Sequence, residues 1–425
     1  MISDTSAPVR LMNKITWLKA MALSILSCAT VAQAQQAPLE PFAVGSHWNE
    51  SKQYTIAKDA GVQWLRIDIN WYHIQPTGPD EWLWAPIDAA VEEAKRLDMK
   101  ILAIMSYSTP WSSSAPKDDN NAKAYAHREE FDERYQAQIR AIVERYKGRI
   151  DAWEVMNEPD HYNFLKIGEG CWAANHFPAA NNDEQRRRQY LHHIELAQKA
   201  IEPFRKEITL TTSGFATGGR YDAEFLNWLA SQEGFFKRYD VLNFHRYGYP
   251  KQDDLIEGIN IFRTLQKDQS LQLPVWVTEH GITRHTADAP PADSARFLVR
   301  SYAVALSNGV DKLFWFRFAP GGDHVTMLKD DGSPSVIHPA YKTMTTHWNA
   351  PIRVTPLGTT VPGVHGAIAD RQDGQRVAIV WADEPVTIES LSLKVTKAFD
   401  LNGAAIQLEP EAEISADPAY LYLEK

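Results

Sequence analysis

Two glutamates each stand just beyond an apolar run of the sequence. Glu158 follows the run 152–156, and Glu279 follows the run 275–278. Cleaving a glycosidic bond needs one protonated carboxyl group, which donates to the leaving oxygen, and one ionised carboxylate, which meets the positive charge at the anomeric carbon. Glutamates on two different strands can supply that pair. The alternative is that both are structural or solvent-facing carboxylates, as most glutamates are.

Parallel strands are needed to bring these carboxylates together. From residue 41 to about 348, short apolar runs alternate with helical patterns, the order that produces parallel sheets through right-handed crossovers. The predicted strands are 42–45, 64–69, 100–105, 152–156, 209–212, 241–244, 275–278 and 312–316. The predicted helices include 86–97, 136–146, 184–204, 223–230, 255–265 and 292–306.

Eight such alternations predict an α/β fold of the closed (β/α)₈ TIM-barrel type. The alternative is a doubly wound open sheet, which usually has fewer strands and a glycine-rich phosphate-binding first turn that this sequence lacks. In a TIM barrel the active site lies at the carboxyl ends of the strands. The barrel therefore places Glu158 and Glu279 at the same mouth.

The pattern of apolar residues changes after residue 348. Helical periodicity gives way to short alternating runs, at 376–381, 386–395 and 420–423, with turn residues between them. We expect a small C-terminal β-sandwich or sheet, packing on the barrel rather than binding sugar. The predicted domains are therefore a catalytic barrel over 35–348 and a β domain over 349–425.

The first 34 residues have the features of a secretory signal peptide. Lys14 and Lys19 precede the apolar run 20–31, and 32–34 reads Ala-Gln-Ala, a small-residue cleavage pattern. Translation could also start at Met12. A run of about a dozen apolar residues is too short to span a membrane, which takes about twenty. We expect a periplasmic or secreted protein with no integral membrane segment after cleavage.

Composition narrows the classes of partner and cofactor. The formal net charge of −10 disfavours nucleic acid, and the 14 Trp and 16 Tyr suit carbohydrate stacking as well as core packing. Leu26 fits a lipoprotein signal at Cys28 poorly, and Cys171 is then the one cysteine left, so no internal disulfide is expected. The sequence has no phosphate loop, paired cysteines or His-x-x-x-His pattern. We expect no cofactor and no metal. The sequence leaves the oligomeric state open.

The motifs resemble clan A of the glycoside hydrolases, and within it family 39 and its exopolysaccharide-hydrolysing relatives. The resemblance covers roughly 41–348 and is carried by 62–71 (VQWLRIDINW), 151–159 (DAWEVMNEP) and the late Thr-Glu pair 278–279. It implies a (β/α)₈ barrel and a retaining mechanism with Glu158 as acid/base and Glu279 as nucleophile. Family 39 usually has Trp before its Asn-Glu-Pro, whereas this chain has Met156.

Further roles follow from the same resemblance. It implies that Arg66 keeps the nucleophile ionised, that Asn157 contacts the sugar 2-hydroxyl, and that His245 and Tyr247 lie near the nucleophile. Trp315 matches the aromatic platform beneath the sugar. Four of these residues also have a purely structural alternative. Arg66 could form a structural salt bridge, His245 and Tyr247 could make hydrogen bonds at the barrel rim, and Trp315 could pack inside the barrel.

Other candidate substrate contacts are His47, Trp111 and the long loop 160–182. The loop carries His161, Tyr162, Phe164, Trp172 and His176. Long loops are often functional, and this one is expected to form a wall of the substrate cleft. Surface aromatic residues that only pack are the alternative.

These features together predict a retaining glycoside hydrolase that cleaves β-type bonds in a poly- or oligosaccharide, with endo action on an exopolysaccharide favoured. The alternatives are an exo-acting glycosidase of the β-xylosidase kind and a non-catalytic polysaccharide-binding protein of the same fold. The family-level resemblance also includes α-L-iduronidases. Loops rather than the barrel set specificity, so the sequence leaves the sugar and the linkage open.

Overall fold

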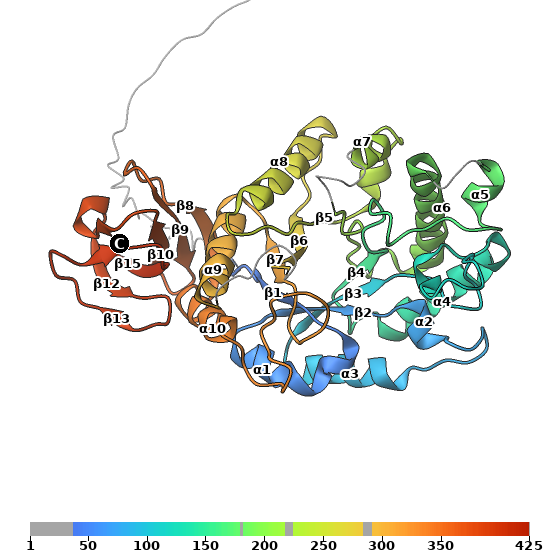
Figure 1. Cartoon of the computed structure of the whole chain (residues 1–425), viewed down its shortest axis with the longest axis horizontal. Coiled ribbons are helices and arrows are strands. Elements are labelled where there is room, and N and C mark those ends of the chain that lie inside the picture. Colours follow the sequence, from blue (N-terminus) through green and yellow to red (C-terminus); the bar gives the residue numbers. More distant parts are fainter. Residues whose placement is uncertain (1–36, 179–181, 217–223, 284–290, 425) are drawn as a thin grey trace, which may run out of the picture. The chain divides into compact units, whose positions relative to one another are not determined.

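The computed structural model describes residues 37–178, 182–216, 224–283 and 291–424 (Figure 1). The predicted signal peptide, with Met12 and Cys28, lies outside them. The chain from Ala37 onwards clusters into one compact unit. Among the described helices, none is both long and apolar enough to cross a membrane.

Seven parallel strands form a curled sheet in the order β4-β3-β2-β1-β7-β6-β5. They are β1 (Phe42–Gly45), β2 (Trp64–Asp68), β3 (Lys100–Met105), β4 (Ala152–Val155), β5 (Leu242–His245), β6 (Val275–His280) and β7 (Lys312–Trp315). Each lies within two residues of a predicted strand.

The eighth predicted strand, 209–212, closes this sheet by isolated bridges rather than as a regular strand. Leu210 pairs with Trp153 of β4, and Thr211 pairs with Val241 just before β5, both in parallel. The ladder is interrupted because the Asn243 N–H donates to the Thr212 hydroxyl, at 2.8 Å, instead of to a carbonyl. The ring is nevertheless continuous, and the predicted barrel architecture is confirmed.

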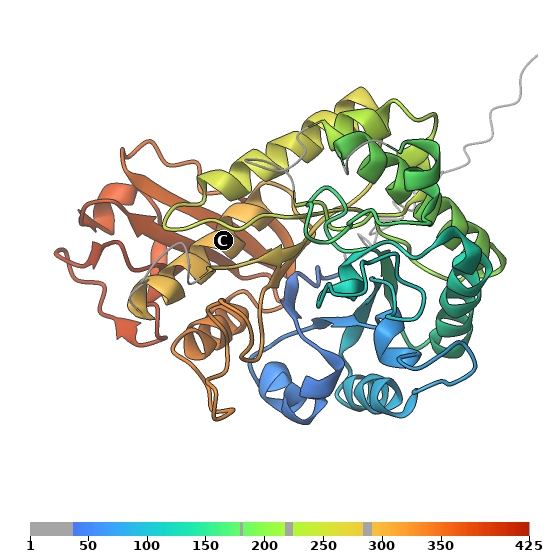
Figure 2. The ribbon, with the colours of Figure 1, turned by 45° about the vertical axis from the view of Figure 1, so that its right-hand side comes forward.

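Helices surround the curled sheet, as Figures 1 and 2 show. They are α1 (Tyr54–Asp59), α2 (Trp71–Ile74), α3 (Ala85–Arg96), α4 (Asp132–Tyr146), α5 (Trp172–His176), α6 (Asp183–Ile201), α7 (Phe225–Ala230), α8 (Asp253–Asp268), α9 (Pro291–Ser307) and α10 (Ile337–His347). All six predicted helices are present. The short α1, α2 and α5 are too brief to show a helical period, and α10 carries a proline in its first turn, where it is tolerated.

The barrel interior is filled by apolar side chains at the end opposite the carboxyl termini of the strands. Trp64 and Trp276 contact each other edge to face there, with Phe314 in the same cluster. The ammonium of Lys312 lies 4.5 Å from the ring of Trp64 and 5.2 Å from that of Trp276. This floor leaves the opposite end of the barrel for the polar side chains.

The C-terminal part forms the predicted β structure. Its six-stranded sheet has the order β13-β12-β15-β10-β9-β8, and β11 pairs with β14. The strands are β8 (Pro351–Pro356), β9 (Val364–Arg371), β10 (Arg376–Ala382), β11 (Val386–Thr387), β12 (Val395–Phe399), β13 (Ala405–Ile406), β14 (Glu413–Ile414) and β15 (Ala419–Leu423). The predicted single run 386–395 is instead split between β11 and β12, because a 3₁₀ turn at 389–391 and a left-handed Ser392 interrupt it.

Candidate active site

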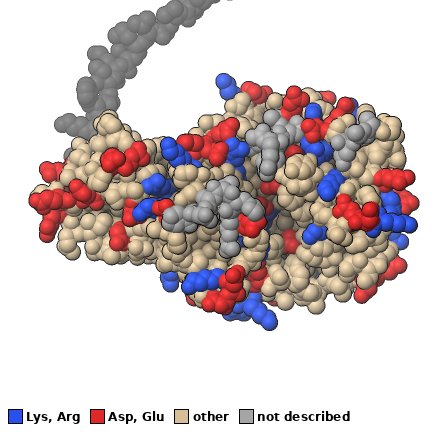
Figure 3. All heavy atoms as spheres, viewed as in Figure 1, with Lys and Arg blue, Asp and Glu red and all other residues tan. Residues whose placement is uncertain are grey.

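A cavity of about 820 Å³ opens where the barrel strands end. Its lining includes residues at or just beyond the carboxyl ends of β1 to β7, among them Glu158 and Glu279. On the described part of the face in Figure 3, acidic and basic side chains are interspersed. Polar residues from the ends of several strands face this one cavity.

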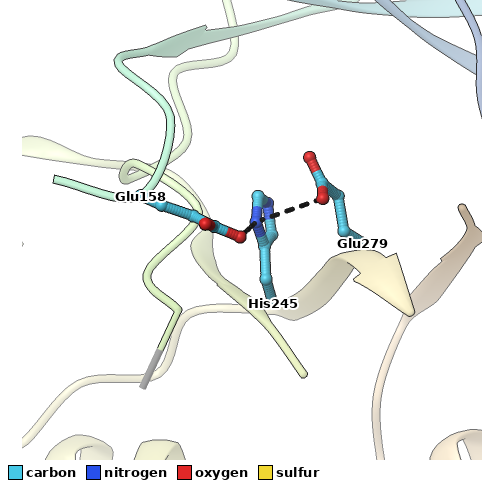
Figure 4. A group of neighbouring side chains, drawn as sticks. All are labelled: Glu158, His245 and Glu279. Carbon is cyan, nitrogen blue, oxygen red and sulfur yellow. Dashed lines mark hydrogen bonds and ion pairs between the residues drawn. The ribbon is translucent and has the colours of Figure 1, made fainter. Parts of the chain in front are cut away.

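Glu158 and Glu279 lie on opposite sides of His245 (Figure 4). One carboxylate oxygen of each glutamate and one nitrogen of His245 all lie within 4.8 Å of one another. Each glutamate is only 7% exposed. The structure therefore brings together two carboxylates that are 121 residues apart in the sequence.

Glu279 is held by two hydrogen-bond donors. Arg66 donates from Nη1 to Oε1 at 2.6 Å, and the Tyr247 hydroxyl donates to Oε2 at 2.6 Å. Burial alone would raise the pKa of Glu279, but the charge of His245, the guanidinium of Arg66 and the Tyr247 hydrogen bond together lower the pKa to about 2. This carboxylate is ionised at neutral pH.

Arg66 connects Glu279 to two other side chains. Its Nε and Nη2 donate to the carboxylate of Glu154 at 2.9 and 3.0 Å, and Nη2 also donates to Asn157 Oδ1 at 2.9 Å. Arg66 is therefore both a partner of Glu279 and part of a buried ion pair. Glu154, which is fully buried on β4, was not predicted, because it reads as one polar residue inside an apolar strand.

Glu158 has a different environment from Glu279. Its nearest partner is His245, whose Nδ1 is 2.8 Å from Oε1. Burial raises the pKa of Glu158; the contact with His245 opposes that shift without cancelling it, and the charge of Glu279 adds to it. Of the two carboxyl groups, Glu158 thus holds a proton to the higher pH.

The backbone around Glu158 is strained. Glu158 has a φ of 39°, Met156 has 67°, and Tyr107 at the end of β3 has 63°, all in the left-handed region that side chains disfavour. Tyr107 and Glu158 both line the cavity. Such strain is often found where a side chain is held for function.

The remaining candidates divide between the cavity and the core. His47 lines the cavity and pairs through Nδ1 with Asp68. Although burial lowers the pKa of His47, the hydrogen bond and charge of Asp68 raise it overall. Asn157, His245 and Tyr247, which the resemblance implied as site residues, also line the cavity.

Two aromatic predictions are wrong about location. Trp315 is fully buried and donates to the Val325 carbonyl at 3.2 Å, and its neighbour Phe316 lines the cavity instead. Trp111 donates to the Gln75 carbonyl at 2.8 Å, and its ring packs beside Trp71, outside the cavity lining. In both cases the indole is held by a backbone carbonyl away from the cavity.

The loop 160–182 contributes part of the cavity wall. His161 and Phe164 line it, whereas Trp172 stacks on His176 and His192 beside α6. Tyr162 is 53% exposed and stacks on His161. Residues 179–181 of this loop lie outside the described part. The predicted cleft wall is thus formed by the first residues of the loop.

Several cavity residues were not predicted. Asp68 stands two residues after Arg66 on β2, and strand alternation puts both on one face, so the sequence did carry this signal. Tyr107 lies two residues beyond the end of β3, and Tyr72 lies in α2, the short helix that follows β2. The Lys123 ammonium lies 4.7 Å from the Tyr72 ring. Lys123 comes from the long connection between β3 and α4, where no strand alternation points to the cavity.

Glu158, His245 and Glu279 are also the one group of three or more His, Cys, Asp or Glu in the described chain whose ligand atoms are close enough to hold a metal ion. The direct His245 to Glu158 contact, at 2.8 Å, uses two of those three ligand atoms for each other.

Comparisons with known proteins bear on the family and on the fold. The family described as "Glycosyl hydrolase catalytic core" matches residues 179–341. Endo-1,4-beta-xylanase C of Paenibacillus barcinonensis is 32% identical over 89 residues, which are 20% of this chain and 8% of that relative. The chain therefore matches only a small part of the length of this curated relative.

Solved structures share the fold across most of the chain. A family 39 glycoside hydrolase from Bacteroides cellulosilyticus WH2 superimposes with a TM-score of 0.66 at 18% identity, covering 92% of this chain and 82% of the other. The family 30 subfamily 8 xylanase Xyn30A from Clostridium acetobutylicum has a TM-score of 0.62 at 11% identity, covering 93% and 98%. A family 39 enzyme from Xanthomonas axonopodis pv. citri has a TM-score of 0.60 at 14% identity, covering 92% and 96%. At these identities the likeness is one of fold.

Proposed function

We propose that this chain, whose residues 179–341 match a glycosyl hydrolase catalytic core, cleaves β-glycosidic bonds with retention of configuration. Glu279 attacks the anomeric carbon, while Glu158 donates a proton to the leaving oxygen. In the second step Glu158 accepts a proton from water, which displaces Glu279 from the sugar. Every atom that moves in these steps belongs to sugar, water or the two glutamates.

The separation of the two carboxylates is the observation that carries this proposal. Their facing oxygens lie within 4.8 Å of each other. Retaining enzymes have carboxyl groups about 5–5.5 Å apart, whereas inverting enzymes leave about 6.5–9.5 Å for a water molecule. The short separation supports direct attack by Glu279.

Unequal environments support the division of roles. Arg66 and Tyr247 keep Glu279 ionised and therefore nucleophilic, and burial beside His245 favours the protonated form of Glu158. Carboxyl groups whose surroundings move their pKa values apart are the usual arrangement for acid and nucleophile.

The cavity supports a substrate longer than one sugar. At about 820 Å³ it is near the upper end of the range of about 300–1,000 Å³ for ligand sites. Tyr72, Tyr107 and Phe164 line it on the side of β2 to β4 and offer flat faces for sugar rings. We favour endo action on a β-linked polysaccharide, such as an exopolysaccharide. Exo action of the β-xylosidase kind remains the second candidate.

The test is hydrolysis by the full mature chain and by variants of each glutamate. We expect release of new reducing ends from at least one of a panel of soluble β-glycans that includes xylan. Glu279→Gln and Glu158→Gln should each lower this activity by at least about 1,000-fold, because each removes a step of the chemistry. Glu195→Gln, on the exposed face of α6, is the matched control and should keep full activity.

The same assay separates catalysis from binding alone. A wild-type protein that binds the glycans without releasing reducing ends would indicate the non-catalytic alternative. Near wild-type activity in a folded Glu279→Gln sample would contradict the assignment of the nucleophile.

Export is proposed from the N-terminal sequence alone. Cleavage after Ala34 would begin the mature protein at Gln35. Amino-terminal sequencing of the protein recovered from the periplasm or medium should give Gln-Gln-Ala-Pro. An unprocessed amino terminus would contradict this proposal.

A further inference from the structure

His245 has a different partner at each ring nitrogen. Nδ1 is 2.8 Å from Oε1 of Glu158, and Nε2 is 3.0 Å from the hydroxyl oxygen of Thr278. Nδ1 is also 3.7 Å from Oε2 of Glu279 (Figure 4). The ring is 1% exposed. The partners, rather than solvent, therefore decide which nitrogen carries a proton.

The hydroxyl of Thr278 has a single proton, which is directed away from His245. It donates to Oδ1 of Asn243 at 2.6 Å. The amide nitrogen of Asn243 points instead to the Thr212 carbonyl, at 3.4 Å, which fixes the amide oxygen towards Thr278. Thr278 and Asn243 are both fully buried. Towards His245, Thr278 is therefore only an acceptor, and Nε2 must carry a proton.

The position of the second proton follows from the first. With Nε2 protonated, a neutral His245 presents a lone pair at Nδ1. A carboxylate oxygen 2.8 Å away would set lone pair against lone pair, so a proton has to lie between Nδ1 and Oε1. It belongs either to Glu158, as a neutral acid, or to His245, as an imidazolium. In both forms the pair holds one transferable proton.

Two other observations agree with a shared proton. The pKa of Glu158 is raised by burial, and the pKa of His245 is raised by Glu279 and Glu158 in spite of burial, so both groups hold a proton to higher pH than usual. Gly214 leaves room for the ring at its Nε2 side, since a Cβ there would lie 2.0 Å from Nε2.

We propose that Thr278 and Asn243 are positioning residues that lock His245 in its Nε2-protonated form, so that the His245–Glu158 pair carries the proton used in catalysis. This inference rests on the proposed role of Glu158. None of the three side chains is required to touch the reacting atoms; they act through Glu158.

The lock has a consequence for each half of the reaction. When the leaving oxygen takes the proton of Glu158, the O–H bond of the acid breaks and the electron pair of the glycosidic bond moves to that oxygen. The carboxylate then faces the bare Nδ1 lone pair. That repulsion favours reprotonation, so Glu158 draws a proton from the attacking water as the bond between the sugar and Glu279 breaks.

The first test reads the protons directly and needs no substrate. Protein labelled with ¹⁵N-histidine is compared by NMR with a His245→Gln sample, which assigns the His245 signals. We expect Nε2 to be protonated in the wild type from pH 5 to 8. A neutral ring protonated only at Nδ1 would overturn the proposal, with no variant of Thr278 needed.

The second test removes and restores the hydroxyl. Thr278→Val keeps the shape but accepts no hydrogen bond, so neutral His245 can carry its proton on Nδ1 and donate to the Glu158 carboxylate. The His245–Glu158 pair then loses one of its two protons at a lower pH, because the form that remains is stabilised by this hydrogen bond. We expect the alkaline limb of kcat/KM to move down by about one pH unit, the effect of one buried hydrogen bond. Thr278→Ser should return the limb to its wild-type position.

The substrate for these profiles is the soluble β-glycan that the wild type hydrolyses fastest, because its leaving sugar oxygen needs the proton of Glu158. A Thr278→Val limb that coincides with the wild-type limb would overturn the lock while leaving the catalytic pair intact. The pair itself is judged by the Glu158→Gln and Glu279→Gln variants, so the two failures are distinguishable.

Discussion

Burial raises the pKa of Glu279, whereas nearby positive charge and hydrogen bonds lower it, and the lowering is the larger effect. The ordinary pKa of 4.5 falls to about 2. Because the folded-state value is below the unfolded one, the stability from this ionisation is complete above about pH 4.5 and is lost as pH falls towards 2. Glu279 is therefore ionised through the whole physiological range.

Removing the Tyr247 hydroxyl should weaken that effect. In Tyr247→Phe we expect the acid limb of kcat/KM to move up by about one pH unit, since one charge-assisted hydrogen bond to Glu279 is lost. Tyr249→Phe is the matched control, because its hydroxyl lies outside the cavity lining. The assignment of Tyr247 fails if the two variants have the same acid limb.

Which single residues can be read from the sequence depends on strand alternation. Arg66, Asn157, His245 and Tyr247 were predicted from the resemblance to clan A, because they match residues of its motifs on β2, β4 and β5 or just beyond them. Glu154 was missed because an ion pair between strands leaves no mark on one strand. At the end of β7 a shift of one residue exchanges Trp315, which faces the helices, for Phe316, which faces the cavity.

At the scale of elements, the irregular segment 210–215 is as important to the site as the regular strands. It joins β4 to β5, and its Gly214 donates to Glu154 at 2.9 Å and accepts from the backbone N–H of Glu158. The same glycine contacts His245. Gly214 thus contacts Glu154, the backbone of Glu158 and the ring of His245, and the contact with His245 depends on the absence of a Cβ.

Gly214→Ala should therefore impair activity far more than a typical glycine substitution. The added methyl would lie 2.0 Å from Nε2 of His245, so the ring or the backbone must shift. A displacement of about 1 Å at a catalytic group costs about 100-fold in rate. Gly78→Ala, whose Cβ would meet nothing within 4 Å, is the control. Equal kcat/KM values for the two variants would contradict this role.

The strand and helix pattern predicted the elements well and their irregularities poorly. Buried parallel strands leave continuous apolar runs, so the seven regular strands were recognisable. The left-handed turns at Tyr107, Met156 and Glu158 were not, because these residue types give no local signal for a positive φ. The cavity wall was predicted only in part, since packing decides which loop aromatics turn inward.

At the scale of the whole molecule, part of the C-terminal sheet belongs to the hydrophobic core of the barrel, while other sheet residues form a second core of their own. Val377, Ile379 and Tyr420 of the sheet belong to the same buried cluster as the barrel residues. The indole of Trp348, which caps α10, is fully buried and donates to the Val377 carbonyl at 2.9 Å. We infer that the sheet and the barrel unfold together rather than as independent domains.

Trp348→Ala should accordingly destabilise the entire chain. Truncating a buried tryptophan costs about 3–5 kcal/mol, and calorimetry should show one transition, shifted to lower temperature, rather than two. Leu408→Ala, also in the C-terminal part but 44% exposed, is the control and should change stability by less than about 0.5 kcal/mol. A barrel transition that keeps its wild-type Tm in Trp348→Ala would show that the sheet is independent.

The central claim is that Glu279 attacks the sugar directly, with Glu158 as its acid/base partner. The most direct test is the configuration of the first product, followed by ¹H NMR during hydrolysis of a 4-nitrophenyl β-glycoside or a soluble β-glycan, before mutarotation. Double displacement predicts that the β-anomer appears first and the α-anomer grows in later. Initial appearance of the α-anomer would mean single displacement by water and would contradict the account.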